Sequence, residues 1–262
     1  MAEFNHVYQR AIYYDIVFNR DVSREVQFIR DMFRHYAGRE LQSVLDIACG
    51  PGYHARAAAK MGLRAIGLDL RGEMLQYAAD QAQTEGVSVD WLEADMRFVK
   101  LTQPVDAAIA MFDGIDALQS DDDLIAHFRC MADNLTPGGI YVLDISHPAD
   151  YHYESYPRVV YHGERDGVEV DIYWATNRAQ FDYPTGVAHV EIEMHINDHG
   201  QKTVIQDTAD ERLLCPGEIR LLAKLSGALE VVGWYGDVKL DQPLDHSLKT
   251  KRMICVMQKK QS

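Results

Sequence analysis

The chain has 262 residues, which suits one sizeable α/β domain or one domain with a small insertion. Its hydrophobic fraction of 47% and charged fraction of 25% are ordinary for a soluble globular protein, and the first residues do not resemble a secretory signal. No apolar run is long enough to cross a membrane, so we expect a cytoplasmic location and no membrane partner. The net charge of −14 argues against a nucleic-acid partner, because such affinity depends mainly on Lys and Arg contacts to phosphate.

Residues 1–40 are predicted to be helical, in two pieces with a break near Asn19. The second piece has one apolar stripe with members three or four residues apart, namely Val22, Val26, Ile29, Phe33 and Tyr36. Gly38 is expected to end this helix.

Strand and helix patterns alternate from residue 43 to residue 145. The strand-like segments 43–47, 65–68 and 105–111 are continuous apolar runs rather than alternating ones. Such runs are typical of strands that are buried on both faces. The pattern therefore predicts a parallel sheet with helices on each side.

The first of these strands ends in an acidic turn rich in small residues, within 44–55. Gly50 and Gly52 let backbone N–H groups and the start of the next helix approach a ligand closely. Gly50 to Ala55 also satisfies the G-x-G-x-x-A pattern of dinucleotide sites. However, the carboxylate of Asp46 would repel a pyrophosphate on this turn, so an NAD(P)-dependent oxidoreductase is the less favoured alternative.

Four further segments follow in order: 65–69, which ends in Asp69, and then 91–97, 106–112 and 135–144. With Asp46-x-Ala48-x-Gly50-x-Gly52, they resemble the class I S-adenosylmethionine-dependent methyltransferases. The first motif of that family is (D/E)-x-G-x-G-x-G, and Ala48 replaces its first glycine. The resemblance implies a Rossmann-like α/β fold with a seven-stranded sheet, and S-adenosylmethionine as cofactor.

The same resemblance implies where the cofactor is bound. The acidic turn is expected to cradle the methionine portion, and the carboxylate at the next strand end to bind the ribose. An apolar pair is expected to cover the adenine face, and the segment 91–97 to read the adenine edge. The implied cofactor-binding residues are Asp46, Ala48, Cys49, Gly50 and Gly52, then Asp69, Leu70 and Met74, then Asp95 and Met96, and finally Met111 beside the sulfonium.

The sequence pattern changes near residue 150. The segments 158–162, 168–177, 187–196 and 203–212 are strand-like and separated by turn signals, which predicts an inserted antiparallel β meander. Two late strands, 229–235 and 253–258, are expected to complete the core sheet. The predicted domains are an N-terminal helical lid (1–40), a methyltransferase core (41–149 and 213–262) and the β insertion (150–212), whose exposed face could support a homodimer.

This layout resembles small-molecule N-methyltransferases such as the aminosugar N,N-dimethyltransferases and glycine N-methyltransferase-like enzymes. Tyr13 and Tyr14 lie in the lid, where that branch places aromatic residues over the reaction chamber. Asp113 and Asp116 follow the fourth strand and could orient an ammonium or hydroxyl group. His147 follows the fifth strand, at the sheet edge where open α/β sheets bind ligands, and could accept a proton.

From these candidates we select Tyr14, Asp113 and His147 as catalytic residues. Each also has a structural interpretation, in a core stripe or on the solvated surface. The histidines of the insertion show no H-x-x-x-H spacing on a predicted helix, and the four cysteines form no C-x-x-C pair, so no metal is predicted.

The predicted function is methyl transfer to a small-molecule acceptor, at an amine nitrogen in preference to an oxygen. Aligned methyl transfer to a neutral amine needs no covalent catalysis by the protein. A catalytically silent S-adenosylmethionine-binding partner subunit is the alternative from another functional class.

Overall fold

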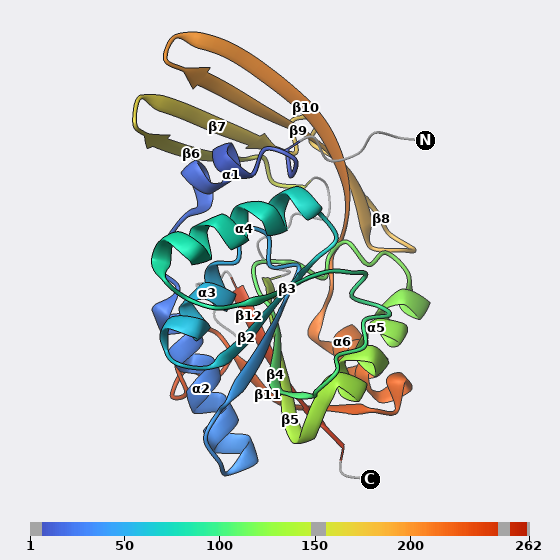
Figure 1. The fold of residues 1–262 in the computed structure, drawn as a ribbon. Helices are drawn as coiled ribbons and strands as arrows, with labels where there is room; N and C mark the ends of the chain where they lie inside the picture. Colours follow the sequence, from blue (N-terminus) through green and yellow to red (C-terminus); the bar gives the residue numbers. More distant parts are fainter. Residues whose placement is uncertain (1–6, 148–155, 246–251, 261–262) are drawn as a thin grey trace.

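The computed structural model describes residues 7–147, 156–245 and 252–260. It confirms the predicted α/β fold with one seven-stranded mixed sheet and a second, antiparallel sheet (Figure 1). The boundary predicted at residue 150 lies outside the described residues. In spatial order, the strands of the core sheet are β11 (Leu229–Tyr235), β12 (Arg252–Lys259), β5 (Leu135–Ser146), β4 (Val105–Ala110), β1 (Ser43–Ile47), β2 (Arg64–Asp69) and β3 (Asp90–Glu93).

The five strands from β5 to β3 are parallel, whereas β12 pairs antiparallel with both β5 and β11. Every residue of β1 and of β4 is buried, which confirms the prediction from their unbroken apolar runs. The chain passes from β1 outward to β3 and then returns to β4 on the other side of β1. A cleft is expected at the carboxyl ends of β1 and β4, because their connections leave in opposite directions.

Helices cover both faces of the core sheet (Figure 1). Two helices pack on one face through a cluster that includes Phe33 and Val44, and two pack on the other through a cluster that includes Phe128 and Tyr141. Each fully buried apolar side chain in these clusters stabilises the fold by about 1.5–3 kcal/mol. The helices on the first face are α2 (Ser23–Ala37) and α3 (Tyr53–Lys60), those on the second are α5 (Asp121–Asn134) and α6 (Pro216–Ser226), and α4 (Gly72–Glu85) joins β2 to β3.

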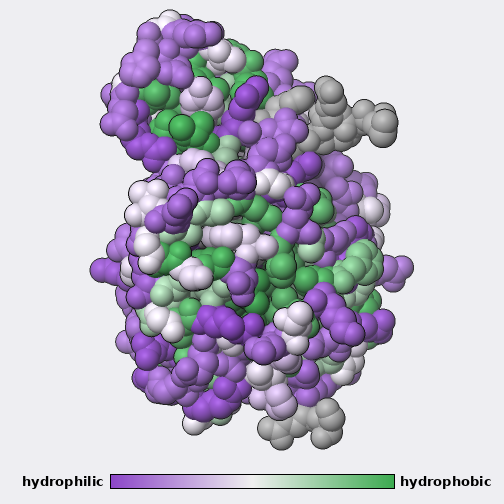
Figure 2. Space-filling view, in the orientation of Figure 1, coloured by the Kyte–Doolittle hydropathy of each residue, from purple (hydrophilic) through white to green (hydrophobic). Residues whose placement is uncertain are grey.

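The insertion forms its own antiparallel sheet beyond the carboxyl edge of the core (Figure 1). Its order is β10 (Gln201–Arg212), β9 (Val187–Asp198), β7 (Val168–Trp174) and β6 (Val159–Arg165), with the short β8 (Phe181–Asp182) beside β9. Buried and exposed residues alternate along β9, so one face of this sheet carries its own apolar cluster. Figure 2 shows the insertion as a smaller upper lobe above the larger core.

The two N-terminal helices have different positions. Whereas α2 packs on the core sheet, α1 (Ala11–Phe18) contacts β6 and β7 of the insertion and also α4. A Cβ on Gly163 of β6 would lie 2.3 Å from the carbonyl oxygen of Ile16, so only glycine permits this close approach. An ion pair of 2.6 Å between Arg165 Nη1 and the buried Asp15 Oδ2 also joins α1 to β6. None of the described helices combines the length and the apolar character needed to cross a membrane.

Candidate active site

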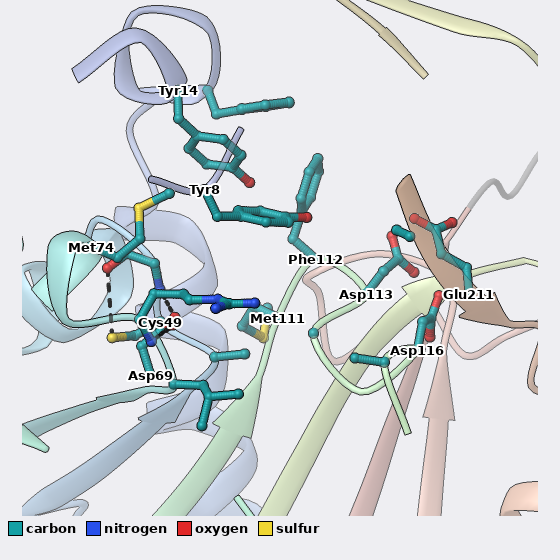
Figure 3. Close-up of a pocket in the computed structure, with 18 of the residues that line it drawn as sticks. Tyr8, Tyr14, Cys49, Asp69, Met74, Met111, Phe112, Asp113, Asp116 and Glu211 are labelled. Atoms are coloured by element: carbon teal, nitrogen blue, oxygen red, sulfur yellow. Dashed lines mark hydrogen bonds between the residues drawn. The ribbon is translucent and has the colours of Figure 1, made fainter. Parts of the chain in front are cut away.

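A cavity of about 1150 Å³ lies at the carboxyl ends of β1, β2 and β4, between the core and the insertion. Figure 3 shows its two sides: Cys49, Asp69 and Met74 on one, and a group of carboxylates on the other. Tyr8 and Tyr14 extend from the N-terminal segment toward the space between these sides. The predicted residues that line the cavity are Tyr14, Asp46, Ala48, Cys49, Gly50, Asp69, Leu70, Met74, Asp95, Met96, Met111 and Asp113.

The turn after β1 has a left-handed backbone at three positions. The φ angles are 51° at Ala48, 51° at Gly50 and 75° at Gly52. Glycine adopts this region freely, whereas an L-residue with a Cβ atom does so at a cost of about 1 kcal/mol or more. A Cβ on Gly50 would meet no atom within 4 Å, and Gly50 lines the cavity. The turn therefore exposes bare backbone to the cavity at Gly50 and is strained at Ala48.

Gly52 has a packing role in addition to the predicted one, which stays a prediction. It does not belong to the cavity lining, and a Cβ there would lie 2.4 Å from Cη2 of Trp91. A Cβ on Gly67 of β2 would lie 2.3 Å from Cζ3 of the same indole. The Trp91 ring thus packs against two glycines and fixes the turn to β2 and β3.

Two carboxylates brace this turn. Asp46 is 2% exposed, and its Oδ2 accepts a hydrogen bond of 3.1 Å from the N–H of Ala55, in the first turn of α3. Burial raises the pKa of Asp46 to about 7. The Asp69 carboxylate accepts one hydrogen bond from the N–H of Gly50 at 2.8 Å and another from the N–H of Arg71 at 2.9 Å. Burial also raises the pKa of Asp69, although these hydrogen bonds oppose the rise.

The carboxylate after β3 is already paired with an arginine. Arg97 Nη2 lies 2.6 Å from Asp95 Oδ2, and Arg97 Nη1 lies 2.6 Å from Asp123 Oδ1 at the start of α5. The Arg97 guanidinium lowers the pKa of both carboxyl groups. Asp95 therefore stays ionised and is held toward α5, and its role in reading an adenine edge stays a prediction.

The residues on this side fit the cofactor that the sequence predicts. Gly50 leaves room for a ligand against the backbone. A carboxylate has about four acceptor positions, so Asp69 retains lone pairs for ribose hydroxyls beyond its two backbone hydrogen bonds. Leu70 is 61% exposed and lines the cavity, as an apolar side chain that covers a planar ring would.

Aromatic side chains from distant parts of the chain enclose the other side. The ring centroid of Phe18 lies 4.4 Å from that of Tyr14, 4.9 Å from that of Tyr161 on β6 and 5.9 Å from that of Phe112. The ring of Tyr8 lies 5.6 Å from that of Tyr14. Burial raises the pKa of the Tyr14 phenol, so this hydroxyl stays protonated at neutral pH and can donate a hydrogen bond.

A buried ion-pair network holds the turn after β4. Phe112 and Asp113 both have positive φ, at 58° and 66°. Asp113 accepts a hydrogen bond of 2.6 Å from the N–H of Ser146 and forms an ion pair with Arg252 of β12. Arg252 Nε also lies 2.8 Å from Asp144 Oδ1 of β5. Asp113 thus secures a strained turn, and its predicted catalytic role stays a prediction.

Two further carboxylates face this side without a cation. Asp116 is 8% exposed and lines the cavity, and its carboxylate has no hydrogen-bond or ion-pair partner among the described residues. Burial, with the nearby Asp113 and Glu211, raises its pKa well above the usual range. Glu211 of β10 accepts hydrogen bonds from the Tyr156 hydroxyl and, at 2.8 Å, from Trp174 Nε1. Burial raises the pKa of Glu211 to about 7.

Tyr13 and Tyr14 are adjacent in the sequence, but their side chains have different environments in the structure. Tyr14 lines the cavity, whereas the Tyr13 hydroxyl donates a hydrogen bond of 3.0 Å to Asp198 of the insertion. His147 is half-buried at the end of β5 and does not belong to the cavity lining, so its predicted role as a base stays untested.

The cavity is also lined by Tyr8, Glu211 and Arg252, which were not predicted as site residues. Asp207 is buried and Ala209 is half-buried on β10, and Glu211 lies on the same face two residues further along, so a glutamate at this position was a detectable signal.

One group in the described part of the chain has side-chain atoms close enough to share a cation. It comprises His162, Glu169 and Asp171 on β6 and β7, with ligand atoms within 4.8 Å of one another. None of the three lines the cavity, and the first two are exposed. The expectation that the protein uses no metal stays a prediction.

Comparison with known proteins finds a family model that matches part of the chain. Residues 44–139, which include the turn and the first four core strands, match the family model described as a methyltransferase domain. A curated relative is the dTDP-3-amino-3,4,6-trideoxy-alpha-D-glucopyranose N,N-dimethyltransferase of Streptomyces venezuelae, 29% identical over 55% of this chain and 58% of the relative. The chain spans about half the length of the curated relatives it matches.

Solved structures resemble the methyltransferase domain and the insertion together. DesVI from Streptomyces venezuelae superposes with a TM-score of 0.75 at 22% identity, over 97% of this chain and 99% of that one. The amino pentose methyltransferase CalS10 from Micromonospora echinaspora, solved with S-adenosylmethionine bound, gives 0.71 at 20% identity over 99% of each chain. At these identities the likeness concerns the fold.

Proposed function

We propose that the protein is an S-adenosylmethionine-dependent methyltransferase that methylates an amine nitrogen of a small molecule. The proposal depends above all on one observation. A glycine turn that exposes bare backbone at Gly50 lies beside the strand-end carboxylate of Asp69, at the place where the strand order reverses. The match of this segment to a methyltransferase domain supports the proposal, as do relatives named as N,N-dimethyltransferases.

When bound, S-adenosylmethionine supplies a methyl group that is already activated, so the protein mainly aligns the reactants and excludes water. Asp69 would hold the ribose, and the backbone at Gly50 would lie against the amino-acid portion. Met111 would lie where the methyl group leaves the cofactor side. The aromatic wall of Tyr14, Phe18 and Phe112 would keep water from the acceptor nitrogen.

The predicted catalytic residues enter this proposal in different ways. Tyr14 is placed to donate a hydrogen bond into the cavity, because burial keeps its phenol protonated. Asp113 acts through Arg252 and Ser146 as a positioning residue. A proton-accepting role for His147, a homodimer through the insertion and a cytoplasmic location stay predictions.

Calorimetry with S-adenosylhomocysteine tests the proposal directly. We expect saturable binding to the wild-type chain and at least about a 30-fold rise in Kd for Asp69→Ala, because hydrogen bonds to a charged group contribute about 1.5–3 kcal/mol each. Asp90→Ala removes an exposed carboxylate from the adjacent β3 and is the matched control, with Kd unchanged. Absence of binding in the wild type would refute the proposal.

A second measurement separates the alternatives. Release of S-adenosylhomocysteine in the presence of amine acceptors is expected for an enzyme. Binding without transfer to any amine, hydroxyl or thiol would favour a silent partner subunit. Tight binding of NADH with no affinity for S-adenosylhomocysteine would favour an oxidoreductase.

A further inference from the structure

The acceptor side of the cavity has more buried acidic groups than cations to balance them. Asp113 and Asp144 share the guanidinium of Arg252, which compensates one of these two charges. Asp116 and Glu211 add two more carboxyl groups, and no described cation pairs with either of them. Burying uncompensated negative charge is unfavourable, so this arrangement favours a ligand that brings a positive charge.

Figure 3 shows that these groups converge. The carboxyl groups of Asp113, Asp116 and Glu211 gather on one side of the cavity, opposite Cys49 and Asp69. Asp116 follows β4 in the core, whereas Glu211 comes from β10 of the insertion, so the two lobes each contribute one group. A buried carboxylate without a hydrogen-bond partner among the described residues is uncommon, and Asp116 lines the cavity.

We propose that Asp116 and Glu211 bind the ammonium group of the acceptor and that one of them takes a proton from it before methyl transfer. This inference rests on the proposed function and names the acceptor class: a small amine that is cationic in solution and carries no phosphate beside the reacting nitrogen.

The step balances in protons and charge. One carboxylate takes a proton from the ammonium group, which leaves a neutral amine and a carboxylic acid. The nitrogen lone pair then forms the new N–C bond while the S–C bond breaks and its electron pair stays on sulfur. The products are a methylated ammonium, S-adenosylhomocysteine and the carboxylic acid, which returns its proton to water after product release.

The surroundings of both acids suit this proton transfer. Glu211 faces Tyr156, Trp174, Tyr8, Tyr161 and the carboxyl group of Asp113, none of which is a cation. The charged groups around Asp116 are Asp113, Asp144, Glu211 and Arg252, which together carry a net negative charge when ionised. A base is most effective when its pKa is close to the working pH, and burial raises the pKa of Glu211 to about 7.

The same charges disfavour a phosphate near the reacting nitrogen. Four arginines line the cavity. Arg20 is paired with Glu25, Arg97 with Asp95 and Asp123, and Arg252 with Asp113 and Asp144, whereas Arg71, which follows Asp69 on the cofactor side, has no ion pair with a described residue. A diphosphate bound to Arg252, the arginine on the acceptor side, would have to displace Asp113 or Asp144. The relatives named for dTDP-linked amino sugars act on nucleotide-linked acceptors, so we expect the acceptor of this chain to differ from theirs.

The experiment uses the full chain, a panel of free amino sugars and short alkyl diamines, their hydroxyl analogues and a dTDP-linked amino sugar. Release of S-adenosylhomocysteine measures transfer. We expect activity with at least one free amine, none with its hydroxyl analogue, and a kcat/KM for the dTDP-linked sugar at least 10-fold lower. Asp116→Asn and Glu211→Gln should each lower kcat/KM for the free amine by about 100-fold, within the usual range for a catalytic base.

Controls separate this role from a structural one. Glu191→Gln removes an exposed charge from β9 and should leave kcat/KM unchanged. Glutamine at position 211 can accept the hydrogen bond of Trp174 with its amide oxygen and donate one to the Tyr156 oxygen with its NH2 group, so a merely structural Glu211 would tolerate the change. For wild type, kcat/KM should fall as pH drops below about 7. In Glu211→Gln this decrease should occur at a different pH or disappear. All variants should keep wild-type affinity for S-adenosylhomocysteine.

Several outcomes would overturn the inference. If both neutral variants keep kcat/KM within about twofold of wild type, the carboxyl groups are structural. A preference for the dTDP-linked sugar, or inactivity toward every free amine while S-adenosylhomocysteine still binds, contradicts the acceptor class. Loss of S-adenosylhomocysteine binding in the wild type refutes the proposed function instead, so the two failures are distinguishable.

Discussion

The two sides of the cavity satisfy their buried charges in different ways. On the cofactor side, Asp46 and Asp69 accept hydrogen bonds from backbone N–H groups, and Asp95 is paired with Arg97. On the acceptor side, the carboxylate of Asp116 has no hydrogen-bond or ion-pair partner among the described residues, and the carboxylate of Glu211 accepts hydrogen bonds only from neutral donors. The cofactor side is complete as it stands, whereas the acceptor side leaves negative charge for a ligand to compensate.

The two sides also differ in how the chain assembles them. The cofactor side comes from one continuous region, 46–96, whose lining residues lie at or after the carboxyl ends of the parallel strands β1, β2 and β3. The acceptor side combines α1, the turn after β4, four strands of the insertion and β12. The cofactor site is therefore formed by the core alone. The charge and shape of the acceptor site depend on how the insertion packs against the core.

The largest expected effect concerns the rigidity of the cofactor side. Gly52→Ala places a Cβ 2.4 Å from Trp91 and in a left-handed backbone, so we expect the free energy of unfolding to fall by about 2–5 kcal/mol. Gly86→Ala is the matched control, because Gly86 has a φ of 70° but open space around its Cβ position, and it should cost only about 1–2 kcal/mol. Urea unfolding measures both. Equal losses would mean that Trp91 moves aside and that the turn is less rigid than described.

A second prediction concerns pH and the acceptor side. Burial raises the pKa of Glu211 from 4.5 to about 7 in the folded protein. A group whose folded pKa is raised contributes stability below its unfolded pKa and loses it as pH rises through the folded value. The stability of wild type relative to Glu211→Gln should therefore fall by about 3 kcal/mol between pH 4 and pH 7.5.

Chemical unfolding of both proteins across this pH range tests the second prediction. Glu191→Gln serves as the control, since its stability should follow the wild-type curve at every pH. Parallel curves for wild type and Glu211→Gln would show that Glu211 titrates near its ordinary pKa. The acceptor side would then not differ from the cofactor side in the way that its buried charges are compensated.

The smallest expected effect returns to the cofactor side. Ala48 adopts a φ of 51°, which glycine adopts without strain. Ala48→Gly should raise the free energy of unfolding by up to about 1 kcal/mol, because relief of strain outweighs the added flexibility of the unfolded chain. Ala57→Gly in α3 should instead lower it by about 1 kcal/mol. Thermal unfolding measures both, and a clear loss at position 48 would mean that the methyl group packs productively.

The sequence predicted the fold because its signals are local. The unbroken apolar run of β1 indicates burial on both faces, and the alternating pattern of β9 indicates a sheet with one covered face. The predicted cofactor residues line the cavity for the same reason, apart from Gly52, which packs against Trp91 and whose contact with the cofactor stays a prediction. Strand ends fix where Asp46 and Asp69 lie, so their spacing was enough to place them together.

The pairing of the acidic residues on the acceptor side could not be predicted from local sequence. Asp113 and Asp116 are three residues apart and look equivalent in the sequence. The structure pairs Asp113 with Arg252, which is far along the chain, and leaves Asp116 facing the cavity. Glu211 belongs to a strand that the sequence analysis assigned only to the insertion.

The amino-acid sequence by itself determined the order of strands and helices, the glycine turn and the strand-end carboxylates, because these depend on residues near one another in the chain. Only the tertiary structure decided which acids are neutralised and which remain free. That outcome depends on how β10, β12 and α1 pack around the turn after β4. A local sequence pattern cannot predict it, because the charged groups belong to elements that are far apart in the chain.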